Sequence, residues 1–253
     1  MTDLKLTANN LPKHKVKFKA SRDDLQMRLF MGIIALYLLV AVAFPLYAMF
    51  SKSLDNREGV FVGIENYIHY FSTPALFYSI YNSLFIAIIT TAITVSLAFT
   101  FAYALTRSCM IGKTFFRTIA MIPILVPSLL AGIALVYLFG SQGVIKSALF
   151  GHSIYGPIGI IIAETFYTFP HALLIIMTAF SIADARMYEA AISLRASPLK
   201  IFFSVTLPGI RYGLISAAFV VFTLVITDFG IPKVIGGKFN VLAVDIYKQV
   251  IGQ

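Results

Sequence analysis

The sequence has no tryptophan and a single cysteine, Cys109, among 253 residues, and only 12% of its residues are Asp, Glu, Lys or Arg. One cysteine excludes an internal disulfide. So few charges, beside 59% hydrophobic residues and a mean hydropathy of +0.87, exclude a soluble globular domain of this length. The composition therefore predicts a membrane protein with several spans.

Five hydrophobic stretches are long enough to cross a bilayer, which takes about 20 largely apolar residues in a helix. They lie near residues 30–50, 80–105, 118–139, 158–180 and 213–228. Small residues such as Ala98 and Ala102 are expected to let these helices approach closely. Proline leaves backbone groups of a helix without hydrogen bonds, and lipid cannot supply them. Pro123, Pro127 and Pro170 are therefore expected inside the bundle.

Basic residues are distributed unevenly along the loops, and this orients the predicted spans. Residues 1–29 form a basic amino-terminal segment and residues 30–253 a membrane domain, with fourteen of the 20 lysines and arginines on the side of the amino terminus. That side, which includes residues 184–208, is predicted to be cytoplasmic. Lys13, Lys15, Lys17 and Lys19 fit either contact with anionic membrane lipid or a solvated topology signal. The net charge of +9 therefore needs no nucleic acid to explain it.

One polar stretch, residues 184–208, interrupts the hydrophobic sequence and carries helix signals. Asp184 is predicted to cap a first short helix. A break is expected near residues 195–196. Ser197 then acts as a second cap, followed by Pro198 at the first helical position, and Pro208 is expected to close the unit.

The same stretch resembles the cytoplasmic coupling loop of ABC-transporter permeases, in which Glu-Ala-Ala is followed by a glycine and, later, by Leu-Pro. The matching residues are Glu189, Ala190, Ala191, Ala196, Ser197, Val205, Leu207 and Pro208. The coupling residues that the resemblance implies are Glu189, Ala190, Ala191, Leu194, Arg195, Ser197, Leu207 and Pro208. The resemblance implies that the loop docks in a groove of a separate ATPase subunit and transmits its closure to the spans. Arg195 stands where that family has glycine, and arginine is sterically disfavoured in a left-handed turn. The alternative interpretation is an amphipathic helix lying on the bilayer surface.

The end of the sequence narrows the resemblance. Residues 227–237 and 240–247 resemble permeases for iron(III), and most closely those for 2-aminoethylphosphonate. Further matching stretches are residues 81–84, 102–107 and 123–127, so the resemblance extends from about Asn82 to the end of the sequence. It implies an all-α polytopic membrane helical bundle of the type I ABC importer permease kind. Five spans are present and a sixth is expected beyond them, so the sequence is expected to be truncated at its carboxyl end. Residues 240–253 read as the start of an amphipathic helix.

The resemblance also implies an activity and partners. The chain would be the permease subunit of an ATP-driven importer in the bacterial cytoplasmic membrane. Its implied partners are a dimer of cytoplasmic ATPase subunits, a periplasmic or lipid-anchored solute-binding protein, and a second permease half that is fused, separate or a second copy. The expected solute is 2-aminoethylphosphonate, with iron(III), polyamine and thiamine as alternatives.

Glu164 is the one acidic residue well inside a predicted span, where a charged carboxylate costs at least about 2.5 kcal/mol. It is expected to form an interhelical hydrogen bond or to contact a polar solute, and a proton relay with His171 is a third reading. Asp228 lies at the end of the fifth predicted span, at the solute path or merely at the interface. With Pro170, these two carboxylates form the candidate solute path or gate.

The sequence shows no nucleotide-binding loop, metal-ligand cluster or nucleophile triad. No catalytic residue, cofactor or metal is expected, and ATP hydrolysis is assigned to a separate subunit. One rival class is an ion-coupled secondary transporter that uses Glu164 and His171, whose inverted repeats should interrupt two helices rather than one. Another is a non-transporting membrane assembly or sensor subunit.

Overall fold

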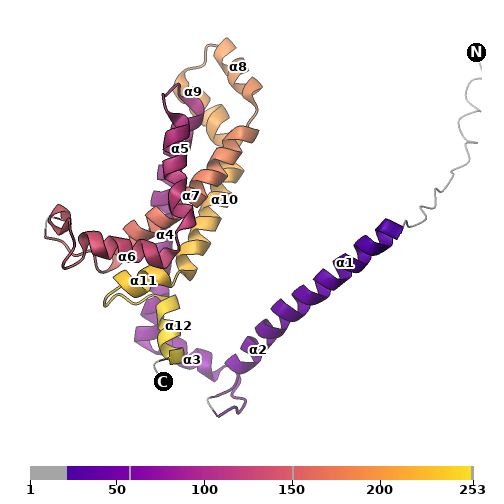
Figure 1. Cartoon of the computed structure of the whole chain (residues 1–253), viewed down its shortest axis with the longest axis vertical. Coiled ribbons are helices and arrows are strands. Elements are labelled where there is room, and N and C mark those ends of the chain that lie inside the picture. Colours follow the sequence, from indigo (N-terminus) through magenta and orange to yellow (C-terminus); the bar gives the residue numbers. More distant parts are fainter. Residues whose placement is uncertain (1–21, 57, 150, 252–253) are drawn as a thin grey trace, which may run out of the picture. The chain divides into compact units, whose positions relative to one another are not determined.

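Figure 1 shows a computed structural model of the chain, which describes residues 22–56, 58–149 and 151–251. The run from Lys13 to Lys19, which fits either a lipid contact or a topology signal, lies outside these residues. The chain divides into two units, residues 1–69 and 70–253. Each unit is helical, and the described residues form one isolated β-bridge, between Asp55 and Phe61.

The first unit is dominated by one continuous helix. It consists of α1 (Arg22–Leu38), the π-helical turn η1 (Leu39–Ala43) and α2 (Phe44–Ser53), and together these 32 residues extend about 48 Å, more than the roughly 30 Å hydrocarbon core. None of its residues is buried within the chain. The π-turn ends two residues before Pro45, which has no N–H to donate to the helical hydrogen-bond pattern. This helix contains the first predicted span.

A loop and α3 (Glu65–Ser72), which crosses the division between the units, follow this helix. Asn66 fastens the start of α3 to the end of α2, because its Nδ2 donates to the backbone oxygens of Ser53 at 2.9 Å and Asp55 at 2.8 Å.

The second unit is built on three long helices that pack together: α4 (Pro74–Arg107), α7 (Pro157–Ile182) and α10 (Leu207–Thr227). Alanine side chains at their contacts are completely buried, including Ala98, Ala102, Ala172 and Ala217. Small side chains let helix backbones approach closely in a membrane, where association depends on van der Waals packing. The predicted role of Ala98 and Ala102 is confirmed.

Short helices lie at the two ends of this bundle (Figure 1). The helices α8 (Ala185–Ser193) and α9 (Pro198–Ile201) lie at one end, and α11 (Gly230–Ile235) and α12 (Leu242–Ile251) lie at the other. Two hydrogen bonds tether the approach to α12: Asn82 Nδ2 donates to the Asn240 oxygen at 2.8 Å, and the Leu242 N–H donates to Ser83 Oγ at 2.7 Å. The predicted helix after residue 240 is therefore confirmed.

The third predicted span is a bent pair of helices. The first arm comprises α5 (Lys113–Met121) and the 3-10 turn η2 (Ile122–Leu125), and the second is α6 (Ser128–Phe139), at 106° to it. Pro127 causes the break, because proline forces the preceding residue out of the helical region, and Val126 is extended. Pro123 and Pro170 are buried as predicted, whereas the expectation for Pro127 is wrong, since it is exposed at the bend. Another 3-10 turn, η3 (Lys146–Leu149), follows α6.

The fifth predicted span is longer than the sequence indicated. The helix α9, the π-helical turn η4 (Phe202–Thr206) and α10 form one continuous 30-residue helix, Pro198–Thr227. Pro208 therefore lies in the first turn of α10 and does not close the preceding unit, contrary to the prediction. The π-turn accommodates this proline, because the Leu207 N–H reaches back to the Phe202 oxygen. The described residues thus form four helices of membrane-spanning length, or five spans if the bent pair counts as one, and the predicted all-α membrane bundle is confirmed.

Gly213 marks the closest approach of α10 to α7. A Cβ atom at this position would overlap the Cβ of Ala179, whereas a Cβ at Gly209, one turn earlier, has its nearest contact at 4.0 Å, with Ala183. The two glycines share a helix but differ in the space beside them.

We expect Gly213→Ala to lower the thermal stability of the purified chain and Gly209→Ala to preserve or raise it. Both changes improve helix propensity, but only the first overpacks the contact, at a cost of about 1–3 kcal/mol. Thermal unfolding in detergent measures both variants. Equal melting temperatures would contradict the assignment of Gly213 as the contact that sets the spacing of α7 and α10.

Candidate functional site

The polar stretch 184–208 forms the two-helix unit predicted from its sequence. Asp184 caps α8, since its Oδ1 accepts a hydrogen bond from the Arg186 N–H at 2.9 Å. Ser197 caps α9 by accepting from the Lys200 N–H at 3.4 Å, and Pro198 occupies the first turn. Both predicted caps are confirmed.

The turn between the two helices has the geometry in which helices commonly end at glycine. The Ala196 N–H donates to the Ala191 oxygen at 3.0 Å, and the Arg195 N–H donates to the Ile192 oxygen at 2.8 Å. This pair of bonds defines a Schellman motif, whose left-handed position is Arg195, at φ 53°. Arg195 therefore adopts the left-handed conformation that glycine adopts more easily. The break expected near residues 195–196 is confirmed.

Apolar side chains of the unit face outward. The exposed large ones are Met187, Ile192, Leu194, Leu199 and Phe203, of which Leu194 is 82% exposed. Glu189 and Ala190 are also exposed, and Ala191 and Leu207 are half-buried. These exposed apolar side chains are therefore available to a partner.

Tyr188 anchors this unit to the bundle. The Arg107 guanidinium, at the end of α4, stacks 4.0 Å from the centroid of the Tyr188 ring, and the Tyr188 hydroxyl donates to Thr206 Oγ1 at 2.9 Å. Thr206 is buried in η4. A cation–π contact contributes about 0.5–2 kcal/mol, depending on how dry it is. One side chain of α8 therefore connects the end of α4 to the start of the last long helix.

An aromatic cluster lies next to the Arg107–Tyr188 contact. The ring centroids of Phe99 and Tyr103 in α4, Phe180 in α7 and Phe202 in η4 lie 5.9 to 6.2 Å apart. Arg107 also lies over Phe180, at 5.7 Å. Sequence reasoning missed Arg107, Tyr188 and Thr206, because they belong to no common helical face. The signal available in the sequence was the position of Tyr188 directly before Glu189.

The candidate solute-path carboxylates lie together near the other end of the bundle. Glu164 is completely buried in α7, and Asp228 lies near it at the end of α10. Asp228 Oδ2 accepts a hydrogen bond from the Ile231 N–H at 2.8 Å. Neither oxygen of Glu164 has a hydrogen-bond donor within the described part of the chain. Two negative charges this near to each other would repel, so a proton or a cationic group beside the pair would be stabilised.

The other polar groups of this region differ in their surroundings. Thr168 Oγ1 donates to the Glu164 backbone oxygen at 2.6 Å and lies 3.4 Å from Thr94 Oγ1 of α4. The His171 ring packs on Tyr167, with centroids 5.6 Å apart. Pro170 is buried in α7, which runs unbroken through it. No group of three or more potential metal ligands occurs among the described residues.

Residues 95–250, more than half of the chain, match the family described as the binding-protein-dependent transport system inner membrane component. The chain belongs to this family of membrane permease components, and it is a multi-pass membrane protein. The match includes the whole two-helix unit and both carboxylates.

Several curated relatives are similar in sequence. The ferric transport system permease protein FbpB of Actinobacillus pleuropneumoniae is 29% identical over 69% of this chain and 26% of its own length. A spermidine/putrescine transport system permease protein PotC homolog of Mycoplasma genitalium is 28% identical over 70% of this chain and 59% of the relative. The molybdenum transport system permease protein ModB of Azotobacter vinelandii is 30% identical over 58% of this chain and 68% of the relative. The chain spans about a quarter of the length of the ferric permeases it matches.

A solved structure shares the fold. The structure resembles a chain of a bacterial ABC transporter involved in the import of the acidic polysaccharide alginate, with a TM-score of 0.75 and 14% sequence identity. The match covers 91% of this chain and 85% of the transporter chain. The same helical architecture is thus present in a bacterial ABC transporter.

The left-handed turn generates a prediction about Arg195. We expect Arg195→Gly to keep α8 and α9 at least as well protected from proteolysis as in the native chain, because glycine adopts positive φ without a steric penalty. Arg195→Val should expose the turn, since a β-branched side chain disfavours this conformation. Limited proteolysis measures both. Arg186→Val, in ordinary helical backbone, is the control, and equal cleavage in both valine variants would contradict the prediction.

The anchor generates a second prediction. Tyr188→Phe removes one hydrogen bond of about 1 kcal/mol and keeps the stacking, whereas Tyr188→Leu removes both. We expect amide hydrogen exchange in α8 to rise slightly in the first variant and strongly in the second. Tyr212→Leu removes the comparable but exposed Arg211–Tyr212 contact at 4.6 Å, and should leave α8 unchanged. Unchanged exchange in Tyr188→Leu would refute the anchor.

Proposed function

We propose that this chain is the transmembrane permease subunit of an ATP-driven importer. The observation that supports this best is the capped two-helix unit, which exposes Glu189 and several apolar side chains while Tyr188 fastens the unit to the bundle. Such a unit combines a docking surface with a rigid connection. Family membership and the shared architecture agree with this function.

The proposed partners follow from the two ends of the bundle. A dimer of cytoplasmic ATPase subunits docks on the two-helix unit, and a second permease half, fused, separate or a second copy, completes the translocation path. A solute-binding protein delivers the solute at the end that carries α11 and α12. A related solved structure is a bacterial alginate ABC transporter in complex with a periplasmic protein that carries an alginate pentasaccharide. The amino terminus and the two-helix unit are cytoplasmic in this proposal, because basic residues concentrate on their side.

The mechanism in this proposal is mechanical. Closure of the ATPase dimer moves the docked unit, and the continuous helix Pro198–Thr227 carries that movement into the bundle. The Arg107–Tyr188 contact carries it to α4 as well. Neither step needs chemistry in this chain.

The pair of carboxyl groups, Glu164 and Asp228, favours one kind of charge on the proposed solute. When ionised, Glu164 and Asp228 would attract a cationic group and repel a bare anion. The ammonium of 2-aminoethylphosphonate, our proposed solute, meets this condition, and so do iron(III), polyamines and thiamine. The pair favours these over the solutes named for the relatives that transport sulfate or molybdenum.

Charge reversal at Glu189 tests the permease function. We expect Glu189→Arg to abolish co-purification of the full chain with its ATPase subunit, while Glu58→Arg, an exposed reversal in the first unit, leaves it intact. Retained association in Glu189→Arg would place docking elsewhere.

Neutralisation of the carboxyl pair tests the solute. In vesicles that hold the complete importer, we expect Glu164→Gln and Asp228→Asn each to reduce 2-aminoethylphosphonate uptake at least tenfold, with ATPase association unchanged. If the native importer takes up no 2-aminoethylphosphonate, the permease function stands and this solute is discarded. Native uptake in both variants would remove the pair from the path.

A further inference from the structure

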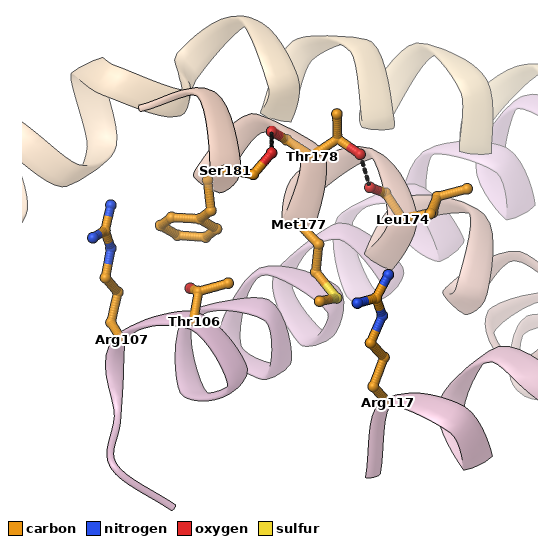
Figure 2. Close-up of a pocket in the computed structure, with 8 residues that line it drawn as sticks. Thr106, Arg107, Arg117, Leu174, Met177, Thr178 and Ser181 are labelled. Atoms are coloured by element: carbon orange, nitrogen blue, oxygen red, sulfur yellow. Dashed lines mark hydrogen bonds between the residues drawn. The ribbon is translucent and has the colours of Figure 1, made fainter. Parts of the chain in front are cut away.

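A second polar feature lies in a cavity at the end of the bundle near α8. The cavity measures about 370 Å³ and lies between the last turn of α4, the first part of α5 and the last turns of α7. Figure 2 shows Arg107 and Arg117 on its two flanks, with Thr106 and Met177 between them. Leu174, Thr178, Phe180 and Ser181 complete the lining.

The charge in this cavity is not balanced by side chains. No carboxylate is found among its lining residues as described. Two of the guanidinium nitrogens of Arg107, Nε and Nη2, are buried and have no hydrogen-bond partner within the described ranges. A buried donor without an acceptor costs about 1–3 kcal/mol, and more when it is charged. The stacking on Tyr188 uses the face of the guanidinium and leaves its in-plane N–H groups unsatisfied.

Backbone dipoles do not neutralise the cavity either. The carboxyl ends of α4 and α7 contribute about half a negative charge each, and the amino end of α5 returns about half a positive charge. Two guanidinium groups exceed this, so a net positive charge of roughly one or more remains at the edge of the membrane region.

The remaining lining groups restrict the ligand. Thr106, Thr178 and Ser181 already donate their hydroxyl protons, to the backbone oxygens of Ala102 at 2.7 Å, Leu174 at 2.8 Å and Thr178 at 2.7 Å. Recognition therefore falls to the two guanidinium groups, whose planar arrays of donors match the oxygens of a phosphate. Leu174 and Met177 add an apolar wall beside this charge.

We infer that this cavity binds a phosphate-bearing anion through Arg107 and Arg117. Two sources share this chemistry: the headgroup of an anionic phospholipid at the membrane surface, and free phosphate from the adjacent aqueous phase. Basic pockets between membrane helices are known to take lipid headgroups, and the apolar wall suits an acyl chain. The site is separate from the carboxyl pair and does not depend on the transported solute.

Arg117→Gln tests the site, because Arg117 is exposed on α5 and makes no hydrogen bond or ion pair with the described residues, so its loss should not perturb folding. The purified full chain is incubated with mixed vesicles of phosphatidylglycerol and phosphatidylcholine, and retained lipid is counted by native mass spectrometry. We expect the native chain to retain phosphatidylglycerol selectively and Arg117→Gln to bind it about fivefold more weakly, the loss expected for one basic side chain beside an anionic headgroup.

Two further arms complete the test. Arg211→Gln removes an exposed arginine outside the cavity and should leave lipid retention unchanged. In detergent, inorganic phosphate is compared with chloride at equal ionic strength by thermal unfolding, and protection of the native chain but not of Arg117→Gln identifies free phosphate as the ligand. Either selective result supports the site. If Arg117→Gln matches the native chain in both arms, or Arg211→Gln loses lipid equally, the inference is wrong.

Discussion

Close packing of α4, α7 and α10 is the constraint on which the rest of the second unit depends. Hydrocarbon tails are as apolar as leucine, so these helices associate through the fit of their surfaces rather than by escaping water. Fully buried alanines and Gly213, against Ala179, provide that fit. Because the two-helix unit leaves the end of α7 and runs directly into α10, its position follows from this packing.

The two-helix unit is fixed to the bundle at both ends and through one side chain, and its remaining surface is exposed. Its chain continues into long helices at both ends, Tyr188 fixes it to Arg107 and Thr206, and its apolar residues face outward. Arg107 belongs both to the contact with Tyr188 and to the lining of the cavity. The face of a guanidinium group can stack on an aromatic ring while its edge donates hydrogen bonds. The anchor and the basic cavity therefore share one side chain.

Acidic and basic side chains lie at different levels of the same bundle. The paired carboxyl groups of Glu164 and Asp228 lie toward the end with α11, and two arginines line the cavity near α8. Buried charge is costly in a membrane and tends to mark functional positions. Relatives of this chain are named for solutes that differ in charge, so the shared helical frame by itself does not specify the solute.

The sequence by itself determined the helical membrane class, the location of the hydrophobic segments and both caps of the two-helix unit, because hydrophobic length and cap chemistry are local properties. Tertiary structure decided what local patterns cannot encode. It bent the third segment by 106° at Pro127, joined residues 198–227 into one helix through a π-turn before Pro208, and left apolar side chains of α8 exposed. It also brought Arg107 to Tyr188 and Glu164 to Asp228, residues separated by more than 60 positions, because only helix packing sets such distances.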